Sequence, residues 1–193
     1  MMGRAPFSLS FLIFLFSFCL YIPSLSGDFV WDDPTYVRHN PFLQEPGALT
    51  EVLTLKVLSR AGVDDNVRPV YLASVLLDRR LWGDKPFGYH LTNVLLHAVN
   101  VMLVFLLASK FLAREPPLPN PPPRGARESE WFPAFAAASL FALHPVVCEP
   151  VCAISFREDL LATLFLLLGL LLASSRPWLT PLCLLLSVMS KES

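Results

Sequence analysis

Three carboxylates, Asp28, Asp32 and Asp33, directly follow a long apolar run, in the segment GDFVWDDPTYVRHN at residues 27–40. Ionised side chains beside lipid are costly to desolvate, so two adjacent aspartates at a membrane boundary need an explanation. A partly desolvated aspartate has a raised pKa, which suits a general base. A bound cation, or a polar interfacial turn anchored by Trp31, would explain the same residues. All three interpretations stay open for this segment.

A second polar segment, HPVVCEPVCAISFRED, occupies residues 144–159. His144, Cys148 and Cys152 are spaced four residues apart, so they would share one face of a continuous helix. An imidazole and two thiolates can bind zinc. The two prolines of the segment disturb a regular helix, however, and no fourth ligand is evident. A disulfide between the two cysteines, or simple packing, accounts for the same spacing.

Membrane helices are the elements expected to position these residues. The chain has 193 residues, of which 54% are hydrophobic and 16% are charged. Because soluble proteins carry about 25% charged residues, this composition predicts an integral membrane protein. The net charge of -1 provides no basic surface, so nucleic acid is not expected as a partner.

The apolar runs predict an all-α, multi-span helical membrane protein with four or five transmembrane helices. The first run, within residues 1–26, is longer than a typical signal-peptide core, which favours a retained signal anchor over a cleaved signal peptide. A polar loop follows at 27–90, and the second span at 91–113. A Pro-rich linker at 114–130 leads to residues 131–193, which contain the third to fifth spans.

Shorter patterns add detail to the loop and to the second span. Residues 49–58 predict a short amphipathic helix on the membrane surface, with a buried strand as the alternative. Residues 70–81 predict a second short helix. Three polar residues of the second span share one helical face, which should point into the protein: Asn93, His97 and Asn100.

Basic residues near the span ends fall on one side of the predicted membrane: Arg4, Lys110, Arg114, Arg124, Arg127 and Arg176. The positive-inside rule makes that side cytosolic. The 27–90 loop and the 144–159 loop therefore face the opposite compartment. This topology places the Asp32 and Asp33 pair in the same compartment as the acidic residues of the second loop.

In combination, these motifs resemble the amino-terminal part of the transmembrane and tetratricopeptide-repeat-containing (TMTC) family of protein O-mannosyltransferases, membrane glycosyltransferases of the GT-C type. The resemblance covers most of residues 27–193. Because that family continues into further spans and luminal repeats, the chain is expected to be a fragment, a truncated isoform or an incomplete sequence. The matching stretches are GDFVWDD with Asn40 following, RPV at 68–70, FGYHLTNVLLHAVNVML, ASLFALHPVVCEPV, REDLLA and SVMSKES.

The resemblance implies an enzyme of the endoplasmic reticulum membrane, with several spans, that transfers mannose from dolichyl-phosphate mannose to Ser or Thr hydroxyls of luminal proteins. Acceptors such as cadherin-type domains are implied. One of Asp32 and Asp33 would be the catalytic residue, and the sequence does not distinguish them. The residues expected to bind the donor phosphate or substrate are Arg68, His144, Glu149, Arg157, Asp159 and Lys191.

No cofactor is expected, because a lipid monophosphate leaving group needs less help from a metal than a nucleoside diphosphate does; a divalent metal ion is not predicted. The alternative function is a non-catalytic membrane scaffold or a partner-binding subunit. Such a protein would keep the entrance of the fold without its activity.

Overall fold

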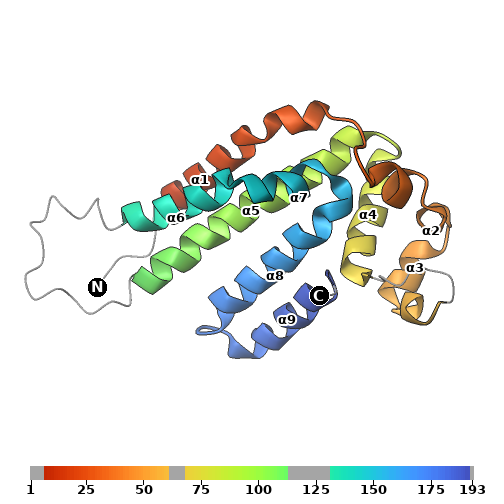
Figure 1. The fold of residues 1–193 in the computed structure, drawn as a ribbon. Helices are drawn as coiled ribbons and strands as arrows, with labels where there is room; N and C mark the ends of the chain where they lie inside the picture. The colour runs from red at the N-terminus through yellow and green to blue at the C-terminus, as the bar shows by residue number, and fades with distance from the viewer. Residues whose placement is uncertain (1–6, 61–67, 113–130, 192–193) are drawn as a thin grey trace, which may run out of the picture.

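The computed structural model describes residues 7–60, 68–112 and 131–191, and helices are the only regular secondary structure in these residues (Figure 1). The expected all-α class is therefore confirmed for these residues. The strand considered for residues 49–58 is absent, because this stretch forms α3 and the short 3-10 helix η3.

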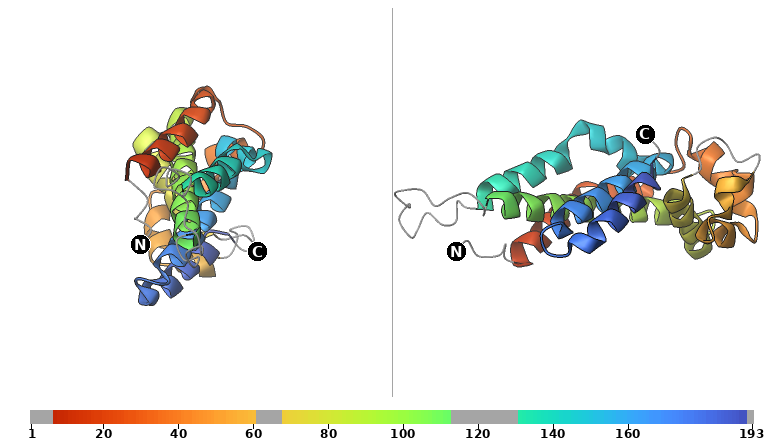
Figure 2. Two further views of the ribbon diagram at one scale, coloured as in Figure 1. Left: turned by 90° about the vertical axis from the view of Figure 1, so that its left-hand side faces the viewer. Right: turned by 90° about the horizontal axis from the view of Figure 1, so that it is seen from below.

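The longest helix, α5 (Pro86–Leu112), is the axis of the molecule, and it begins at a proline whose fixed φ suits a first helical turn. Helices α1 (Phe7–Leu20) and α6 (Phe132–Leu143) pack along α5 (Figure 1). Helix α8 (Arg157–Leu172) packs against another side of α5, and α9 (Thr180–Val188) packs against α8. The result is an elongated helical bundle (Figure 2).

Small residues bring α6 close to α5. Ala134, Ala138 and Ala142 recur every four residues on one face of α6, and all three are fully buried. They join a core cluster with Val101 and Phe105 of α5. A stripe of alanines allows two helix backbones to approach closely, which suits packing in an apolar environment.

The polar face of α5 points inward, as the sequence predicted. Asn93 and Asn100 are fully buried. The side-chain amide of Asn93 donates to the carbonyl of Ala153 at 3.3 Å, and that of Asn100 donates to the carbonyl of Leu160 at 2.9 Å. These hydrogen bonds attach α5 to the start of α8 and so support the polar end of the bundle.

The segment between the first two predicted spans is a small helical unit rather than a simple loop. It contains α2 (Pro41–Gln44), α3 (Ala48–Leu53), η3 (Lys56–Ser59) and α4 (Pro69–Trp82), which includes the expected helix at 70–81. It lies at one end of the elongated molecule (Figure 2). Apolar residues of this unit form a hydrophobic core together with Val37, which precedes α2. The residues of the unit are Phe42, Leu43, Leu49, Val52, Val57, Leu72, Val75 and Leu76.

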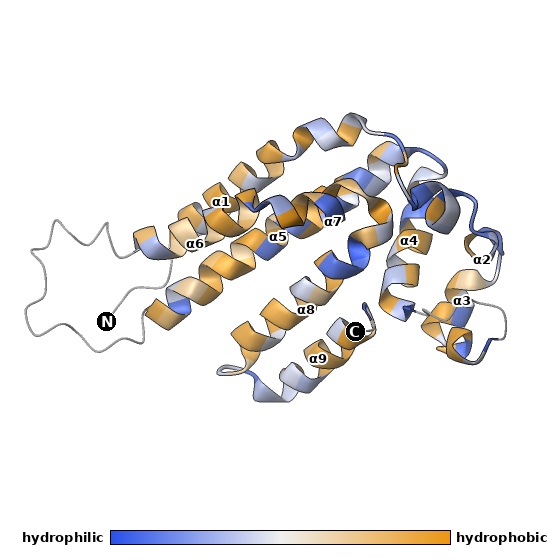
Figure 3. Ribbon diagram, viewed as in Figure 1, coloured by the Kyte–Doolittle hydropathy of each residue, from blue (hydrophilic) through white to orange (hydrophobic). Residues whose placement is uncertain are grey.

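The chain between α6 and α8 breaks at His144, whose backbone is extended because the next residue is a proline. The short helix η5 (Pro145–Val147) and α7 (Cys148–Cys152) follow, bent by 52° from α6. A further short helix, η6 (Ile154–Phe156), leads directly into α8. This irregular path places the first turn of α8 at the polar end of the bundle (Figure 3).

One described helix, α5, is long and apolar enough to cross a bilayer, and a second span exists if α6 and the bent 145–152 stretch count as one. The four or five spans expected from the sequence are therefore not reached by helix length. Helices α1 and α9 have 14 and 9 residues; at 1.5 Å per residue both are shorter than the hydrocarbon core.

Candidate functional site

The structure separates Asp32 from Asp33. Asp33 is fully buried, and its carboxylate accepts hydrogen bonds from the backbone amides of Ser155 at 2.7 Å and Val30 at 3.2 Å. Asp32 is exposed, and no hydrogen bond or ion pair with another described residue involves its carboxylate. Asp33 thus fastens the turn to η6, whereas the side chain of Asp32 is exposed.

The backbone of this turn is strained at the residue before the two aspartates. Trp31 has a φ of 51°, in the left-handed region that non-glycine residues seldom occupy. Its indole ring is 70% exposed and meets the ring of Phe156 edge-on at 6.4 Å between centroids. Such conformations persist where surrounding contacts enforce them, and here the Asp33 hydrogen bonds lie beside the strained residue.

Two ion pairs bring the ends of three helices together beside this turn. Arg68, at the start of α4, pairs with Glu158 in the first turn of α8, and Lys191, after α9, pairs with Asp159. The amide of Val70 also donates to the carbonyl of Met189 at 3.3 Å. Three segments that lie far apart in the sequence therefore form one polar cluster of four residues: Arg68, Glu158, Asp159 and Lys191. Three of these residues, Arg68, Asp159 and Lys191, were predicted to bind substrate.

The two ion pairs of this cluster differ in solvent exposure. The Arg68 side chain is 22% exposed and that of Glu158 is 7% exposed, whereas Lys191 and Asp159 are about two-fifths exposed. Burial raises the pKa of Glu158, an effect that the positive charge of Arg68 partly opposes. The Arg68 pair is thus the inner part of the cluster, and the Lys191 pair is its solvent-facing edge.

Arg157 directly precedes Glu158 of this cluster in the sequence and is fully buried. Its guanidinium contacts a carboxylate oxygen of Asp78 at 2.6 Å, donates to the side-chain oxygen of Asn93 at 2.6 Å and donates to the carbonyl of Tyr89 at 2.9 Å. Burial raises the pKa of Asp78, while the charge of Arg157 lowers it. These partners make Arg157 a link between α4, α5 and α8.

The remaining predicted residues lie apart from these bonds. His144 is exposed, and its Nδ1 accepts the amide of Val146 at 3.3 Å, so it acts as a local cap. Glu149 is exposed in the first turn of α7. Neither side chain contributes to the ion pairs of the cluster. Their proposed part in substrate binding stays a prediction.

The cysteines of the second polar segment form neither a disulfide nor a zinc site. Cys148 and Cys152 are both free thiols, and Cys148 Sγ lies 3.6 Å from the hydroxyl of Tyr21. Among the described residues, no group of three or more His, Cys, Asp or Glu side chains could hold a metal ion. His144 therefore does not join the two cysteines in a zinc site.

Sequence reasoning missed several residues of the cluster. Ser155 supplies a backbone amide, which no motif reveals. Asp78 belongs to none of the matching stretches, yet its carboxylate pairs with Arg157 and accepts a hydrogen bond from the hydroxyl of Thr92 at 2.8 Å. Tyr71 lies one helical turn after Arg68, and only that spacing could have connected the two.

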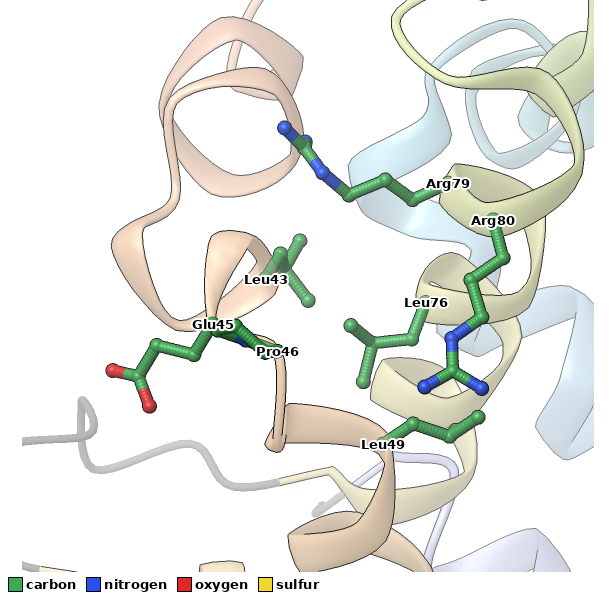
Figure 4. A pocket seen from close by; sticks show the side chains of 7 residues that line it. All are labelled: Leu43, Glu45, Pro46, Leu49, Leu76, Arg79 and Arg80. Atoms are coloured by element: carbon green, nitrogen blue, oxygen red, sulfur yellow. The ribbon is translucent and has the colours of Figure 1, made fainter.

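A separate pocket lies within the α2–α4 unit (Figure 4). It has a volume of about 210 Å³, with leucine side chains and two arginines, Arg79 and Arg80, around it. Arg79 also pairs with Asp84 at 3.4 Å. None of the residues predicted from the sequence to act in the site lines this pocket. The polar cluster at the helix ends is therefore the candidate functional site.

Fold and site together define a class, an all-helical protein with an apolar bundle and a charged site where several helices end. Known proteins of related sequence make this class specific. The chain is 30% identical over 180 residues to Protein O-mannosyl-transferase F38B6.6 of Caenorhabditis elegans, a match covering 89% of this chain and 24% of that protein. It is 33% identical over 156 residues to human Protein O-mannosyl-transferase TMTC2, covering 79% and 17% respectively.

A third relative, human Protein O-mannosyl-transferase TMTC1, is 30% identical over 175 residues, covering 88% of this chain and 18% of that protein. These matches confirm the resemblance to the TMTC protein O-mannosyltransferases. The chain spans about a quarter or less of the length of these curated relatives. No family model matches the chain. No solved structure is significantly similar to it.

Proposed function

We propose that the chain carries the catalytic end of a protein O-mannosyltransferase, which transfers mannose from dolichyl-phosphate mannose to Ser or Thr hydroxyls of proteins in the lumen of the endoplasmic reticulum. The names of its relatives support this reaction class. Luminal acceptors such as cadherin-type domains belong to the same proposal. No metal or other cofactor takes part in the proposed reaction.

In this mechanism Asp32 is the general base. Its free, exposed carboxylate takes the proton of the acceptor hydroxyl while that oxygen forms a bond to the anomeric carbon. The bond from the anomeric carbon to the phosphate oxygen breaks, and dolichyl phosphate leaves with the electron pair. Attack opposite the leaving group inverts the anomeric centre without a covalent enzyme intermediate. Asp33 acts as a positioning residue for Asp32.

The donor phosphate would bind at the solvent-facing edge of the cluster. Lys191 and Arg68 are the cations of the described site whose side chains have exposed surface, whereas Arg157 has none. A cation beside the departing phosphate stabilises the negative charge that develops there. We propose these two residues as the phosphate ligands and Arg157 as their structural support.

The apolar exterior supports a membrane location. Large hydrophobic side chains are exposed on several outer helix surfaces, including Phe11, Phe132, Leu140, Leu170 and Leu184, and apolar residues predominate along these helices (Figure 3). Such surfaces are typical of contact with lipid or with a partner. We propose a multi-pass arrangement in the endoplasmic reticulum membrane, in which local bilayer thinning accommodates the short helices. The lipid tail of the donor would then lie in the bilayer, with its phosphate at the polar end.

The observation that carries this proposal is the contrast between the two aspartates, one free and one fixed. The test compares Asp32→Asn, Asp33→Asn and a control, Asp84→Asn, at an exposed carboxylate outside the cluster. Each variant is made in this chain and in a full-length relative. Mannose transfer from dolichyl-phosphate mannose is measured in membranes that lack the endogenous activity, and thermal unfolding is measured in parallel.

We expect Asp32→Asn to lower transfer at least about a hundredfold with an unchanged melting temperature, because only the base is lost. Asp33→Asn should lower both transfer and the melting temperature, since an amide has one acceptor oxygen for two backbone N–H groups. Full transfer by Asp32→Asn would refute the assigned base. No transfer by either unmodified protein would instead favour the non-catalytic scaffold.

A further inference from the structure

Among the described residues, three hydrogen-bonding groups of the site are buried without a partner: the hydroxyl of Ser155, the hydroxyl of Tyr71 and the Nε–H of Arg68. The last two lie together in the sequence at the start of α4, where Arg68 is the N-cap and Tyr71 is in the first turn. The Tyr71 side chain is 7% exposed. Leaving a buried polar group unpaired costs about 1–3 kcal/mol, so such groups are rare in folded proteins and call for a ligand or another explanation.

The Tyr71 hydroxyl lies among four charges of the site. Burial raises its pKa; the positive charges of Arg157 and Arg68 lower it, and the negative charges of Glu158 and Asp33 raise it. The phenol therefore stays protonated at physiological pH and can both donate and accept a hydrogen bond. The two cations and the two carboxylates thus act on the phenol in opposite directions.

The mixture of positive and negative charges around Tyr71 favours a neutral ligand group over an anion. An anion beside Tyr71 would meet two carboxylates as well as two guanidinium groups, so it would gain little from the local field. A neutral hydroxyl group suits the position better, because it can accept from Arg68 Nε–H and exchange a hydrogen bond with the phenol. The inner end of the cluster thus fits a polyol, and the outer end, at Lys191, fits the phosphate.

We propose that Tyr71 and the Nε–H of Arg68 bind a ring hydroxyl of the sugar carried by the lipid donor. This inference rests on the proposed function and extends it, since it assigns the sugar and the phosphate to different parts of one cluster. Tyr71 becomes a specificity-determining residue. A site built to bond a substrate hydroxyl discriminates strongly, because a wrong sugar leaves its polar groups unpaired.

Tyr71→Phe is the test, because it removes only the unpaired oxygen. Its control is Tyr89→Phe, which removes a hydroxyl that donates to the carbonyl of Gly83 at 2.8 Å. The full 193-residue chain, in lipid nanodiscs, is titrated with dolichyl-phosphate mannose and separately with dolichyl phosphate. The melting temperature of each variant is measured without ligand.

We expect Tyr71→Phe to bind dolichyl-phosphate mannose about tenfold more weakly, as one lost hydrogen bond implies. Its affinity for dolichyl phosphate and its melting temperature should not fall. Tyr89→Phe should melt at a lower temperature and keep its affinity for the mannosyl lipid. This pattern cannot arise from a purely structural role of Tyr71, which would alter stability instead.

Equal affinities of Tyr71→Phe and the unmodified chain for the mannosyl lipid would overturn the inference, and so would a loss of equal size for both lipids. Absence of binding to the unmodified chain would overturn it as well. Mannose transfer decides the proposed function separately. Tyr71-dependent binding without transfer would refute the enzyme and leave the sugar site, whereas transfer with Tyr71-independent binding would do the reverse.

Discussion

At the scale of single residues, the site depends on side chains that never reach solvent. Arg157 and Asp33 are both fully buried. One connects α4, α5 and α8, and the other connects the turn after α1 to η6. Because a buried charge is tolerated only when it is paired and hydrogen-bonded, these residues make the site geometry part of the fold itself.

We predict that Arg157→Met will destabilise the protein by about 3–5 kcal/mol, because Asp78 is then left buried without its countercharge. The double variant Arg157→Met with Asp78→Leu should recover much of this loss. Lys191→Met should change stability by about 1 kcal/mol or less, since its ion pair with Asp159 is largely exposed. Chemical denaturation in detergent measures all three, and similar losses for Arg157→Met and Lys191→Met would contradict the prediction.

At the scale of elements, the junction of α4 and α5 determines how the site residues of these two helices are oriented. The chain turns at Gly83, whose φ of 62° favours glycine. The indole ring of Trp82 then packs directly on Gly88, in the first turns of α5. This contact is possible only because Gly88 has no side chain, and it sets the angle between the helix carrying Arg68 and the helix carrying Asn93.

We predict that Gly88→Ala will destabilise the protein by about 1–3 kcal/mol, because the added Cβ would lie 2.0 Å from the indole ring of Trp82. The control is Gly47→Ala, where an added Cβ meets no atom within 4 Å. That variant should unfold within about 0.5 kcal/mol of the unmodified chain. Equal stabilities of the two variants would show that Trp82 moves aside without cost.

At the scale of the whole molecule, the polar cluster and the α2–α4 unit lie toward one end of the bundle (Figures 1 and 3). Helix α5, the clearest candidate span, runs away from that end. In the proposed orientation, this end faces the lumen and the 114–130 linker faces the cytosol. Acceptor proteins and the base would then occupy the same compartment.

We predict that an engineered glycosylation site will report this orientation. Lys56→Asn with Leu58→Thr creates a sequon on η3, at two exposed positions, and should acquire a glycan. Pro121→Ala with Pro122→Thr creates a sequon at Asn120 in the linker and should stay unmodified. A glycosidase-sensitive mass shift on expression in microsomes is the measurement. A glycan at Asn120 but not at position 56 would reverse the proposed topology.

The sequence by itself determined the helical class and the inward face of α5, and it predicted site residues near positions 32, 68 and 157. These features follow from local patterns, since helix periodicity and the cost of placing amides or charges in lipid are expressed within a few turns of chain. Family motifs added the reaction class, which the relatives support.

Only the tertiary structure distinguished the surroundings of residues that look alike in the sequence. Asp32 and Asp33 are neighbours of the same type, and they differ because the amide of Ser155, 122 residues away, reaches just one of them. From its sequence position, Arg157 was expected to bind phosphate, but in the structure its guanidinium is occupied by Asp78 and Asn93. Tyr71 belongs to none of the motifs found in the sequence. Burial and hydrogen-bond partners depend on contacts between distant segments, which local sequence patterns do not encode.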